Sequence, residues 1–138
     1  MIDCTGKNNN YKSLVKYLSN GVKKVLVSAP IKDKNILNLV YGVNHKLYDK
    51  NKHSIVTGAS CTTNCLAPIV KVVHENLHII HGSMTTVHNV TNSQTIIDKP
   101  SNDLRRSRSS MTNIIPTTTG SAKAVSYTHL TLPTIYSV

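Results

Sequence analysis

The sequence contains no phenylalanine and no tryptophan, and aromatic residues make up only 4% of its 138 residues. This content is low for an independent domain, because aromatic side chains supply a large share of the apolar area in most protein cores. This low content is a first indication that part of the fold is missing. It also lacks any apolar run near the ~20 residues of a membrane-spanning helix, so we expect no membrane association.

Acidic residues are scarce as well: six Asp and Glu stand against sixteen Lys and Arg, which gives a net charge of +10. Such a balance is typical of nucleic-acid-binding proteins. Here the basic residues are spread along the chain, and the one tight cluster is Arg105, Arg106 and Arg108. No aromatic residues alternate with these arginines, as a stacking platform for bases would require. We therefore expect no nucleic-acid partner.

Cysteine is too scarce for a disulfide framework. The three cysteines, Cys4, Cys61 and Cys65, cannot all pair within one chain, and the sequence shows no signal peptide. Reduced thiols are the normal state of cytosolic proteins. We therefore expect a cytoplasmic protein with reduced thiols.

Apolar patterning predicts an α/β chain. Residues 11–20 have helical spacing and end at Asn-Gly, and the Val-rich strand that follows, residues 22–29, ends at Pro30. A strand, a helix and a strand in this order favour a parallel sheet. Further strands are predicted at residues 1–7 (a strand end and a turn), 39–44, 54–57 and 78–88.

The segment GASCTTNCLAP places a cysteine at a predicted helix start. Ser60, Thr62, Thr63 and Asn64 are capping residue types, and apolar residues then recur at helical spacing, which predicts a helix over residues 62–77. A helix N-terminus favours a thiolate, and so does an imidazole such as His88 at the end of the next predicted strand. The pattern indicates covalent catalysis by Cys61 on a carbonyl carbon. An inert core cysteine remains the alternative at this point.

A zinc site is a second alternative, because Cys61, Cys65, His74 and His78 have the spacing C-x3-C-x8-H-x3-H. The central interval of a zinc finger is longer, and here it is one predicted helix. That helix would separate the thiols from the imidazoles by about two turns or more. We therefore expect no metal site, and we interpret Cys65 as a packing residue.

The segment ASCTTNCLAP strongly resembles the active-site signature of phosphorylating glyceraldehyde-3-phosphate dehydrogenases. The resemblance covers residues 1–125, because other family segments follow in order: MIDCTGK, VKKVLVSAP, YGVNHKLYD, MTTVHNVTNSQTIID and NIIPTTTGSAKAV. It implies an α/β fold in which the end of a Rossmann-type NAD-binding domain, residues 1–60, is followed by the start of the α+β catalytic domain, residues 61–125. The latter includes a long polar loop, residues 89–119.

The resemblance also implies residue roles. Cys61 is the expected nucleophile, and His88 is the base that activates it and later relays the proton. The residues implied in binding the phosphate groups of the substrate or inorganic phosphate are Ser60, Thr62, Thr91, Thr119 and Gly120. Those implied to lie near the dinucleotide are Thr5, Gly6 and Ser28.

The implied reaction is the oxidation of glyceraldehyde 3-phosphate by NAD, or NADP, to an acyl phosphate through a cysteine thioester, in a cytoplasmic homotetramer. The family's glycine-rich opening turn and its C-terminal half are absent from these 138 residues, so we expect the isolated fragment to be inactive. The alternative is a non-enzymatic basic binding module on a relic of the same fold.

Two segments depart from the glycolytic pattern of the family. DLRRSRSSMTN resembles the subclass associated with arsenate resistance and, more distantly, the erythrose-4-phosphate enzymes. The TTTG segment favours the first of these, for which arsenate is an alternative to inorganic phosphate. Residues 126–138 leave the pattern abruptly and resemble translated adapter sequence, so we expect a non-native tail there.

Overall fold

The computed structural model describes residues 1–121, which divide into two compact units. The first contains Met1–Gly82 and Ser121, and the second contains Ser83–Gly120. The expected non-native tail, residues 126–138, lies outside the described residues. No helix of the described chain has both the length and the apolar character that crossing a membrane requires.

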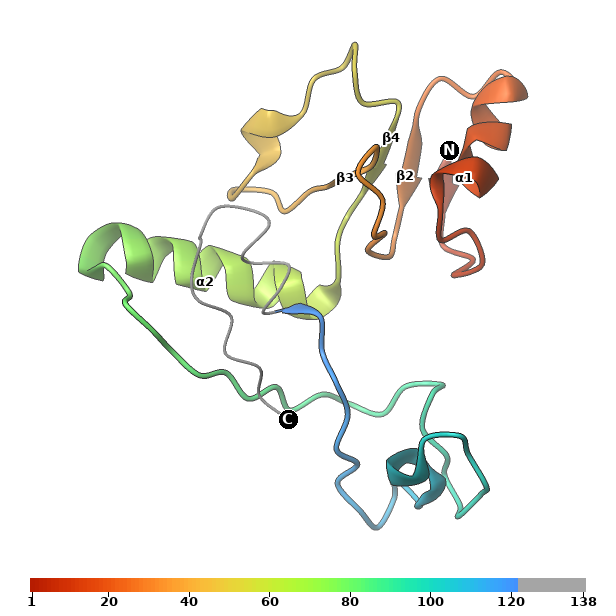
Figure 1. Ribbon diagram of the computed structural model, residues 1–138, viewed down its shortest axis with the longest axis vertical. Helices are drawn as coiled ribbons and strands as arrows, with labels where there is room; N and C mark the ends of the chain where they lie inside the picture. Colours follow the sequence, from red (N-terminus) through yellow and green to blue (C-terminus); the bar gives the residue numbers. More distant parts are fainter. Residues whose placement is uncertain (122–138) are drawn as a thin grey trace. The chain divides into compact units, whose positions relative to one another are not determined.

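The first unit is an α/β structure, as its sequence predicts (Figure 1). Its elements are, in order, β1 (Ile2–Asp3), α1 (Tyr11–Ser19), β2 (Val25–Val27), β3 (Leu37–Asn38), the 3-10 helix η1 (His45–Leu47), β4 (Ile55–Thr57) and α2 (Cys61–Leu77).

The four strands form one parallel sheet in the order β1-β2-β4-β3. Their last residues are in register: Asp3 pairs with Val27, Val27 with Thr57, and Thr57 with Asn38. The loops that leave the four strands therefore all start from the same edge of the sheet, which we call the carboxyl edge. In α/β proteins ligands bind at this edge.

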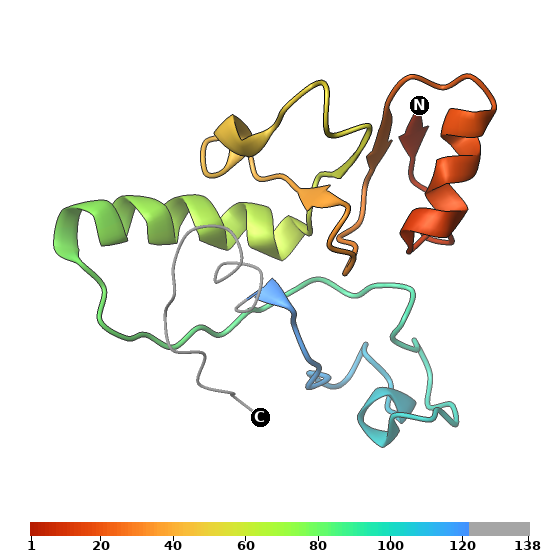
Figure 2. The ribbon, with the colours of Figure 1, turned by 45° about the horizontal axis from the view of Figure 1, so that its top comes forward.

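Helix α1 covers the sheet beside β2 (Figure 2). It begins at Asn10, whose side chain accepts a hydrogen bond from the Ser13 amide at 2.9 Å, and it ends at Asn20 before Gly21, which adopts a left-handed φ of 86°. Leu14 projects from α1 into the core and is fully buried. Its buried neighbours are Val25, Val27, Ile31, Ile36 and Ile55.

Helix α2 packs one face on a second core cluster of Val40, Val43, Ala59 and Ala67. Its opposite face is exposed, and it includes Ile69, Val72 and Leu77. Pro68 lies inside the helix, where its missing N–H removes one backbone hydrogen bond. The helix ends at His78, which is left-handed with a φ of 51°.

Two predicted strands are wrong. Residues 39–44 form a turn rather than a strand, because the Asn44 side chain closes the chain on itself: its oxygen accepts from the Val40 amide at 2.7 Å, and its nitrogen donates to the Asn38 carbonyl at 2.9 Å. The strand is the shorter β3 just before this turn. Residues 78–88 have the alternation of a strand, but they pair with no strand in the described chain. Alternation of apolar and polar residues predicts which side chains share a face of a strand. It does not show whether another strand is present to pair with the backbone.

The second unit has almost no regular structure. Its one helical element is the 3-10 helix η2 (Leu104–Ser107), and an isolated bridge pairs Thr95 with Ser109. No residue between positions 83 and 120 is fully buried. This unit is therefore organised by polar contacts and not by a core.

Candidate active site

A tight turn leads from β4 directly into α2. After Thr57, the last residue of β4, the Gly58 amide donates to the Val27 carbonyl at 2.9 Å, and the Ala59 amide donates to Thr57 Oγ1 at 3.0 Å. Ala59 has a left-handed φ of 57°, a conformation that costs a residue with a Cβ about 1–2 kcal/mol. The turn is buried at Ala59, which is only 5% exposed. These contacts fix the point at which the helix begins.

Ser60 caps the helix. Its Oγ accepts a hydrogen bond from the Thr63 amide at 3.0 Å and lies 2.6 Å from Thr63 Oγ1. The Asn64 side chain donates to the carbonyls of Gly58 at 2.7 Å and Ser60 at 2.9 Å, which binds the first helical turn to the chain before it. The capping residue types in the sequence predicted this helix start. They did not predict the hydrogen bonds by which the Asn64 side chain fixes the turn before it.

Cys61 is the first residue of α2, as predicted. Its side chain is exposed, and its Sγ lies 3.9 Å from Thr62 Oγ1. The first amides of a helix have no acceptor within the helix, and the helix dipole is positive at this end. Both effects favour a thiolate or another anion at the position of the Cys61 sulfur.

Three residues expected near the dinucleotide lie along the same carboxyl edge. Thr5 and Gly6 form the turn after β1, and Ser28 follows β2, with its amide donating to the Asp3 carbonyl at 3.0 Å. Gly6 has a left-handed φ of 68°, and nothing lies within 4 Å of the position a Cβ would take there. Neighbouring strands are about 4.8 Å apart, so the ends of β1 and β4 are about 10 Å apart. The structure therefore brings these residues and Cys61 to one edge.

Asp3 organises the turn that contains Thr5 and Gly6. Its carboxylate accepts hydrogen bonds from the Thr5 amide at 2.8 Å, the Thr5 hydroxyl at 2.7 Å, Asn8 Nδ2 at 2.7 Å and the Tyr17 hydroxyl at 3.2 Å. Asp3 is 2% exposed. These donors, first among them the Thr5 amide, lower the pKa of Asp3 to about 2. Burial, and then the neighbouring Asp3 carboxylate, raises the pKa of Tyr17.

The Asp3 network was missed from the sequence, although a signal for part of it was present. An Asp followed two residues later by Thr, with Gly next, is typical of a turn in which the carboxylate accepts from the backbone two residues on. The contacts with Asn8 and with Tyr17 of α1 depend on the fold, and no local pattern predicts them.

The expected base, His88, lies in the second unit and is exposed. Its Nδ1 is 2.7 Å from the Asn89 carbonyl oxygen. A carbonyl oxygen only accepts, so Nδ1 is the donor, and in the neutral ring Nε2 is then the nitrogen that accepts a proton. This tautomer suits a general base that acts through Nε2. The approach of His88 to Cys61 stays a prediction.

The other expected phosphate-binding residues of the second unit are also exposed. Thr91 lies in a turn in which its amide and its hydroxyl both donate to Gln94 Oε1 at 2.7 Å, and its Oγ1 is 3.0 Å from Ser93 Oγ. Thr119 and Gly120 are exposed at the end of the long loop. The roles of these residues and of Ser60 and Thr62 in binding phosphate stay predictions.

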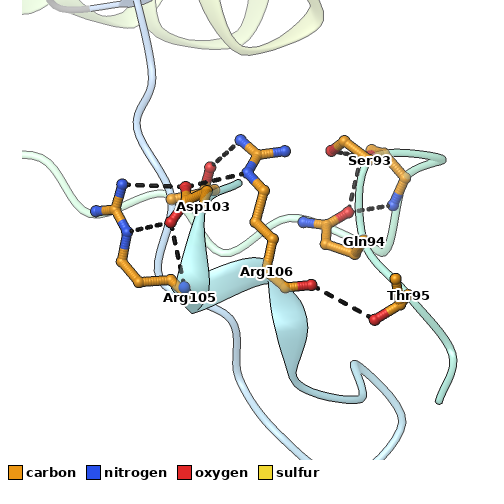
Figure 3. A network of polar contacts seen from close by, with 8 residues as sticks. Ser93, Gln94, Thr95, Asp103, Arg105 and Arg106 are labelled. Carbon is orange, nitrogen blue, oxygen red and sulfur yellow. Dashed lines mark hydrogen bonds and ion pairs between the residues drawn. The ribbon is translucent and has the colours of Figure 1, made fainter. Parts of the chain in front are cut away.

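The arginine cluster is paired with acids of its own loop (Figure 3). Arg105 donates from Nε to Asp103 Oδ1 at 3.0 Å and from a terminal nitrogen to Oδ2 at 3.2 Å, and Arg106 Nε lies 3.5 Å from Asp103 Oδ2. Arg108 pairs with Asp98 at 2.9 Å. The Arg105 side chain, the largest cause, lowers the pKa of Asp103. All three guanidinium groups are thus engaged within the loop.

The residues of the zinc alternative are spread along one helix. Cys65 and His74 are nine positions apart, or about 14 Å along the axis of α2. The rings of His74 and His78 meet edge to face with centroids 6.0 Å apart. Among residues 1–121 no group of three or more His, Cys, Asp or Glu side chains has an arrangement that could hold a metal ion.

The interpretation of Cys65 as a buried packing residue is wrong for this chain. Its side chain is exposed, on the face of α2 that points away from the core cluster. Helical spacing predicted that α2 has an apolar stripe, but Cys65 falls outside the part of that stripe that packs on Val40 and Val43.

Comparison with known proteins identifies the relatives of this chain. A family model described as glyceraldehyde 3-phosphate dehydrogenase, C-terminal domain, matches residues 60–135. The chain is 53% identical over 125 residues to glyceraldehyde-3-phosphate dehydrogenase 3 of Nostoc sp. and 50% identical over 125 residues to glyceraldehyde-3-phosphate dehydrogenase of Geobacillus stearothermophilus. Each alignment covers 91% of this chain and 37% of the relative.

A third relative, glyceraldehyde-3-phosphate dehydrogenase of Streptomyces coelicolor, is 51% identical over 133 residues, which cover 96% of this chain and 38% of the relative. The chain therefore spans little more than a third of the length of the curated relatives it matches.

Proposed function

The chain belongs to the glyceraldehyde-3-phosphate dehydrogenase family, and from this premise we propose that Cys61 is the nucleophile of an aldehyde oxidation that proceeds through a thioester. The observation that carries the proposal is the placement of Cys61 as the first residue of a 17-residue helix capped by Ser60. The substrate we propose is glyceraldehyde 3-phosphate. Because the chain spans 37% of its relatives' length, the proposal concerns an enzyme that also has the remaining parts.

The proposed steps use side chains of this chain. His88 accepts the thiol proton of Cys61 on Nε2, the Cys61 thiolate adds to the aldehyde carbon, and the oxyanion takes that proton back to form a hemithioacetal. His88 accepts the hydroxyl proton again as the hydride leaves the hemithioacetal carbon. The chemistry supplied by bound NAD or NADP is acceptance of the hydride, which leaves a thioester on Cys61. Inorganic phosphate then attacks the thioester carbon, the C–S bond breaks, and the products are an acyl phosphate and the Cys61 thiolate.

The residues at the carboxyl edge fit a dinucleotide. The open space around Gly6, the exposed Ser28 and the position beyond the ends of parallel strands suit a flat, polar cofactor. Thr5 and Gly6 would approach it from the turn after β1, and Ser28 from the next loop.

Anionic groups of the substrate suit the start of α2. The hydroxyls of Ser60 and Thr62 and the amides of the first helical turn offer donors to a phosphate oxygen or to the developing oxyanion. Thr91, Thr119 and Gly120 are the residues we propose for the same role from the long loop. Arsenate as an alternative to inorganic phosphate, a homotetrameric assembly and a cytoplasmic location complete the proposal.

The alternative, a basic binding module, has less support. A polyanion would need free guanidinium groups, whereas Arg105, Arg106 and Arg108 are paired with Asp103 and Asp98. Breaking those pairs would offset part of any gain from a phosphate contact.

The test is to trap the thioester in the complete enzyme. Mixing it with glyceraldehyde 3-phosphate and NAD without inorganic phosphate should add one acyl group to the peptide that contains Cys61, as read by mass spectrometry. The Cys61→Ser variant should give no adduct, and Cys65→Ser, which removes the neighbouring exposed thiol, should still give it. An adduct on Cys65, or oxidation of the aldehyde by Cys61→Ser, would refute the proposal.

His88 has its own test in the same enzyme. His88→Asn should slow the reaction by about 10²–10⁴-fold, the usual contribution of a positioned general base. A rate within a few-fold of the unmodified enzyme would remove His88 from the mechanism and leave the role of Cys61 intact.

A further inference from the structure

The hydroxyl of Thr57 connects the edge strand of the sheet to the turn before Cys61. Thr57 Oγ1 donates to Asn38 Oδ1 at 2.7 Å and accepts from the Ala59 amide at 3.0 Å. Thr57 is fully buried, so water does not replace either partner. Only Ser60 lies between the left-handed Ala59 and Cys61 at the helix start.

The direction of these hydrogen bonds is determined by Asn38. Its Oδ1 accepts from the Ile31 amide at 3.0 Å, and its Nδ2 donates to the Ile31 carbonyl at 2.9 Å, so the side-chain amide has one orientation. Its oxygen therefore faces Thr57, and the one proton of the Thr57 hydroxyl goes to that oxygen. The lone pairs of Thr57 Oγ1 are then the acceptor for the Ala59 amide.

The Ala59 amide needs this acceptor. Ala59 is buried and left-handed, so a buried amide without a partner would add a desolvation cost to the cost of the strained φ. Removal of the hydroxyl alone would leave the sheet bonds of β4 in place, including the one from the Gly58 amide to Val27. The effect should therefore be concentrated in the turn that aims the helix start.

We propose that Thr57, with its hydroxyl oriented by Asn38, is a positioning residue for Cys61: it holds the left-handed Ala59 turn that sets where the sulfur lies relative to the first amides of α2. Thr57 is fully buried, so its hydroxyl acts on Cys61 through the backbone. The proposal rests on the proposed role of Cys61 as a nucleophile and adds two residues, on strands β4 and β3, that act through the backbone.

The test compares Thr57→Val with Thr57→Ser in the full chain. Valine has the shape of threonine without the hydroxyl, and serine restores the hydroxyl. Thr112→Val is the matched control, because Thr112 is exposed in the second unit and its hydroxyl only accepts from Asn113. Two readouts are used: amide hydrogen exchange at Ala59 and Gly58, and the rate of alkylation of Cys61 relative to Cys4 and Cys65 by iodoacetamide at neutral pH.

In Thr57→Val the Ala59 amide should exchange at least tenfold faster, while the Gly58 amide keeps its protection and so reports that the sheet is intact. Alkylation of Cys61 should fall by about tenfold, since a small displacement of a reacting group is costly, and its pH profile should shift to higher pH. Thr57→Ser should restore both readouts, and Thr112→Val should change neither.

Unchanged Cys61 alkylation in a Thr57→Val chain whose Gly58 amide stays protected would overturn the positioning role. If Thr57→Val unfolds the sheet, the Thr57→Ser variant provides the test instead. An alkylation rate of Cys61 in Thr57→Ser as low as in a denatured chain would overturn the positioning role of Thr57. A rate equal to that of the unmodified chain would support it. Failure of the proposed function is a separate outcome, seen in the unmodified chain as a Cys61 rate no higher than those of Cys4 and Cys65.

Discussion

The two units of this chain are stabilised internally by different kinds of interaction. The first has a parallel sheet, two helices and core clusters around Leu14 and Val40. The second has no fully buried residue, and its order comes from ion pairs, side-chain caps and one isolated bridge. Burial of apolar area is worth about 25 cal/mol per Å², whereas exposed ion pairs contribute little. The first unit should therefore resist unfolding much more than the second.

The residues of the proposed reaction are also divided between the unit with a core and the long loop. Cys61 and the residues of the carboxyl edge belong to the unit with the core, and His88 belongs to the unit without one. A nucleophile at a helix start depends on fixed amides and a fixed dipole, so it needs a rigid support. Loops have the lower local stability that binding segments commonly use.

The largest effect on this contrast is expected from Leu14→Ala. Leu14 is fully buried, with 0% of its surface exposed to solvent. The substitution should therefore lower the free energy of unfolding of the first unit by about 2–5 kcal/mol. The matched control is Leu104→Ala in η2, where the side chain is 81% exposed. This substitution should change the free energy of unfolding by less than about 0.5 kcal/mol. Urea unfolding followed by hydrogen exchange measures both. Similar losses for the two variants would contradict the contrast.

Asp3→Asn should have a smaller but still clear effect. The new amide would direct a donor at Asn8 Nδ2, itself a donor, within a buried network, which should cost about 1–3 kcal/mol. Asp49→Asn is the control, because Asp49 accepts from the Asn51 amide in an outer loop of the same unit. Equal unfolding midpoints for the two variants would show that the Asp3 network adds no stability.

The Asp3 network also predicts a pH dependence. The pKa of Asp3 is lowered from 3.8 to about 2 in the folded chain, so its stabilising effect is complete above about pH 4 and is lost as the pH falls toward 2. Unfolding free energies measured between pH 5 and pH 2 should fall more steeply for the unmodified chain than for Asp3→Asn. Parallel curves would mean that Asp3 does not titrate as this structure requires.

The smallest effect is expected from Asp103→Asn in the second unit. It breaks the ion pairs that Asp103 makes with Arg105 and Arg106, and it should speed tryptic cleavage at these arginines by a few-fold. Cleavage at lysines of the first unit should not change. Asn102→Ala, an exposed neighbour, is the control, and equal cleavage of both variants would show that the ion pairs do not order the loop.

The same contrast explains what the sequence could predict. In the first unit, apolar periodicity and capping residues predicted α1, α2 and the strands β2 and β4, and the cap-rich SCTTN segment predicted Cys61 at a helix start. These features depend on residues within one or two turns of each other. Residues 39–44 were predicted as a strand but form a turn. The hydrogen bonds of the Asn44 side chain to the backbone close this turn, and a pattern of apolar residues does not predict them.

Other features depend on partners far away in the chain. Residues 78–88 have a strand pattern but no strand partner among residues 1–121. The exposure of Cys65 follows from which face of α2 meets Val40 and Val43, and spacing alone does not choose that face. The Thr57–Asn38 and Asp3–Tyr17 hydrogen bonds join residues 19 and 14 positions apart. The family resemblance supplied site residues, but these supporting contacts required the structure.

One measurement tests the central claim most directly, because all three thiols of the chain are exposed and accessibility does not distinguish them. Cys4, Cys61 and Cys65 are alkylated together with limiting iodoacetamide at pH 7, and the modified peptides are quantified by mass spectrometry over time. The helix start should make Cys61 react about tenfold faster than Cys65, one turn further along the same helix, and faster than Cys4. Equal rates for the three thiols in the folded chain would contradict the account.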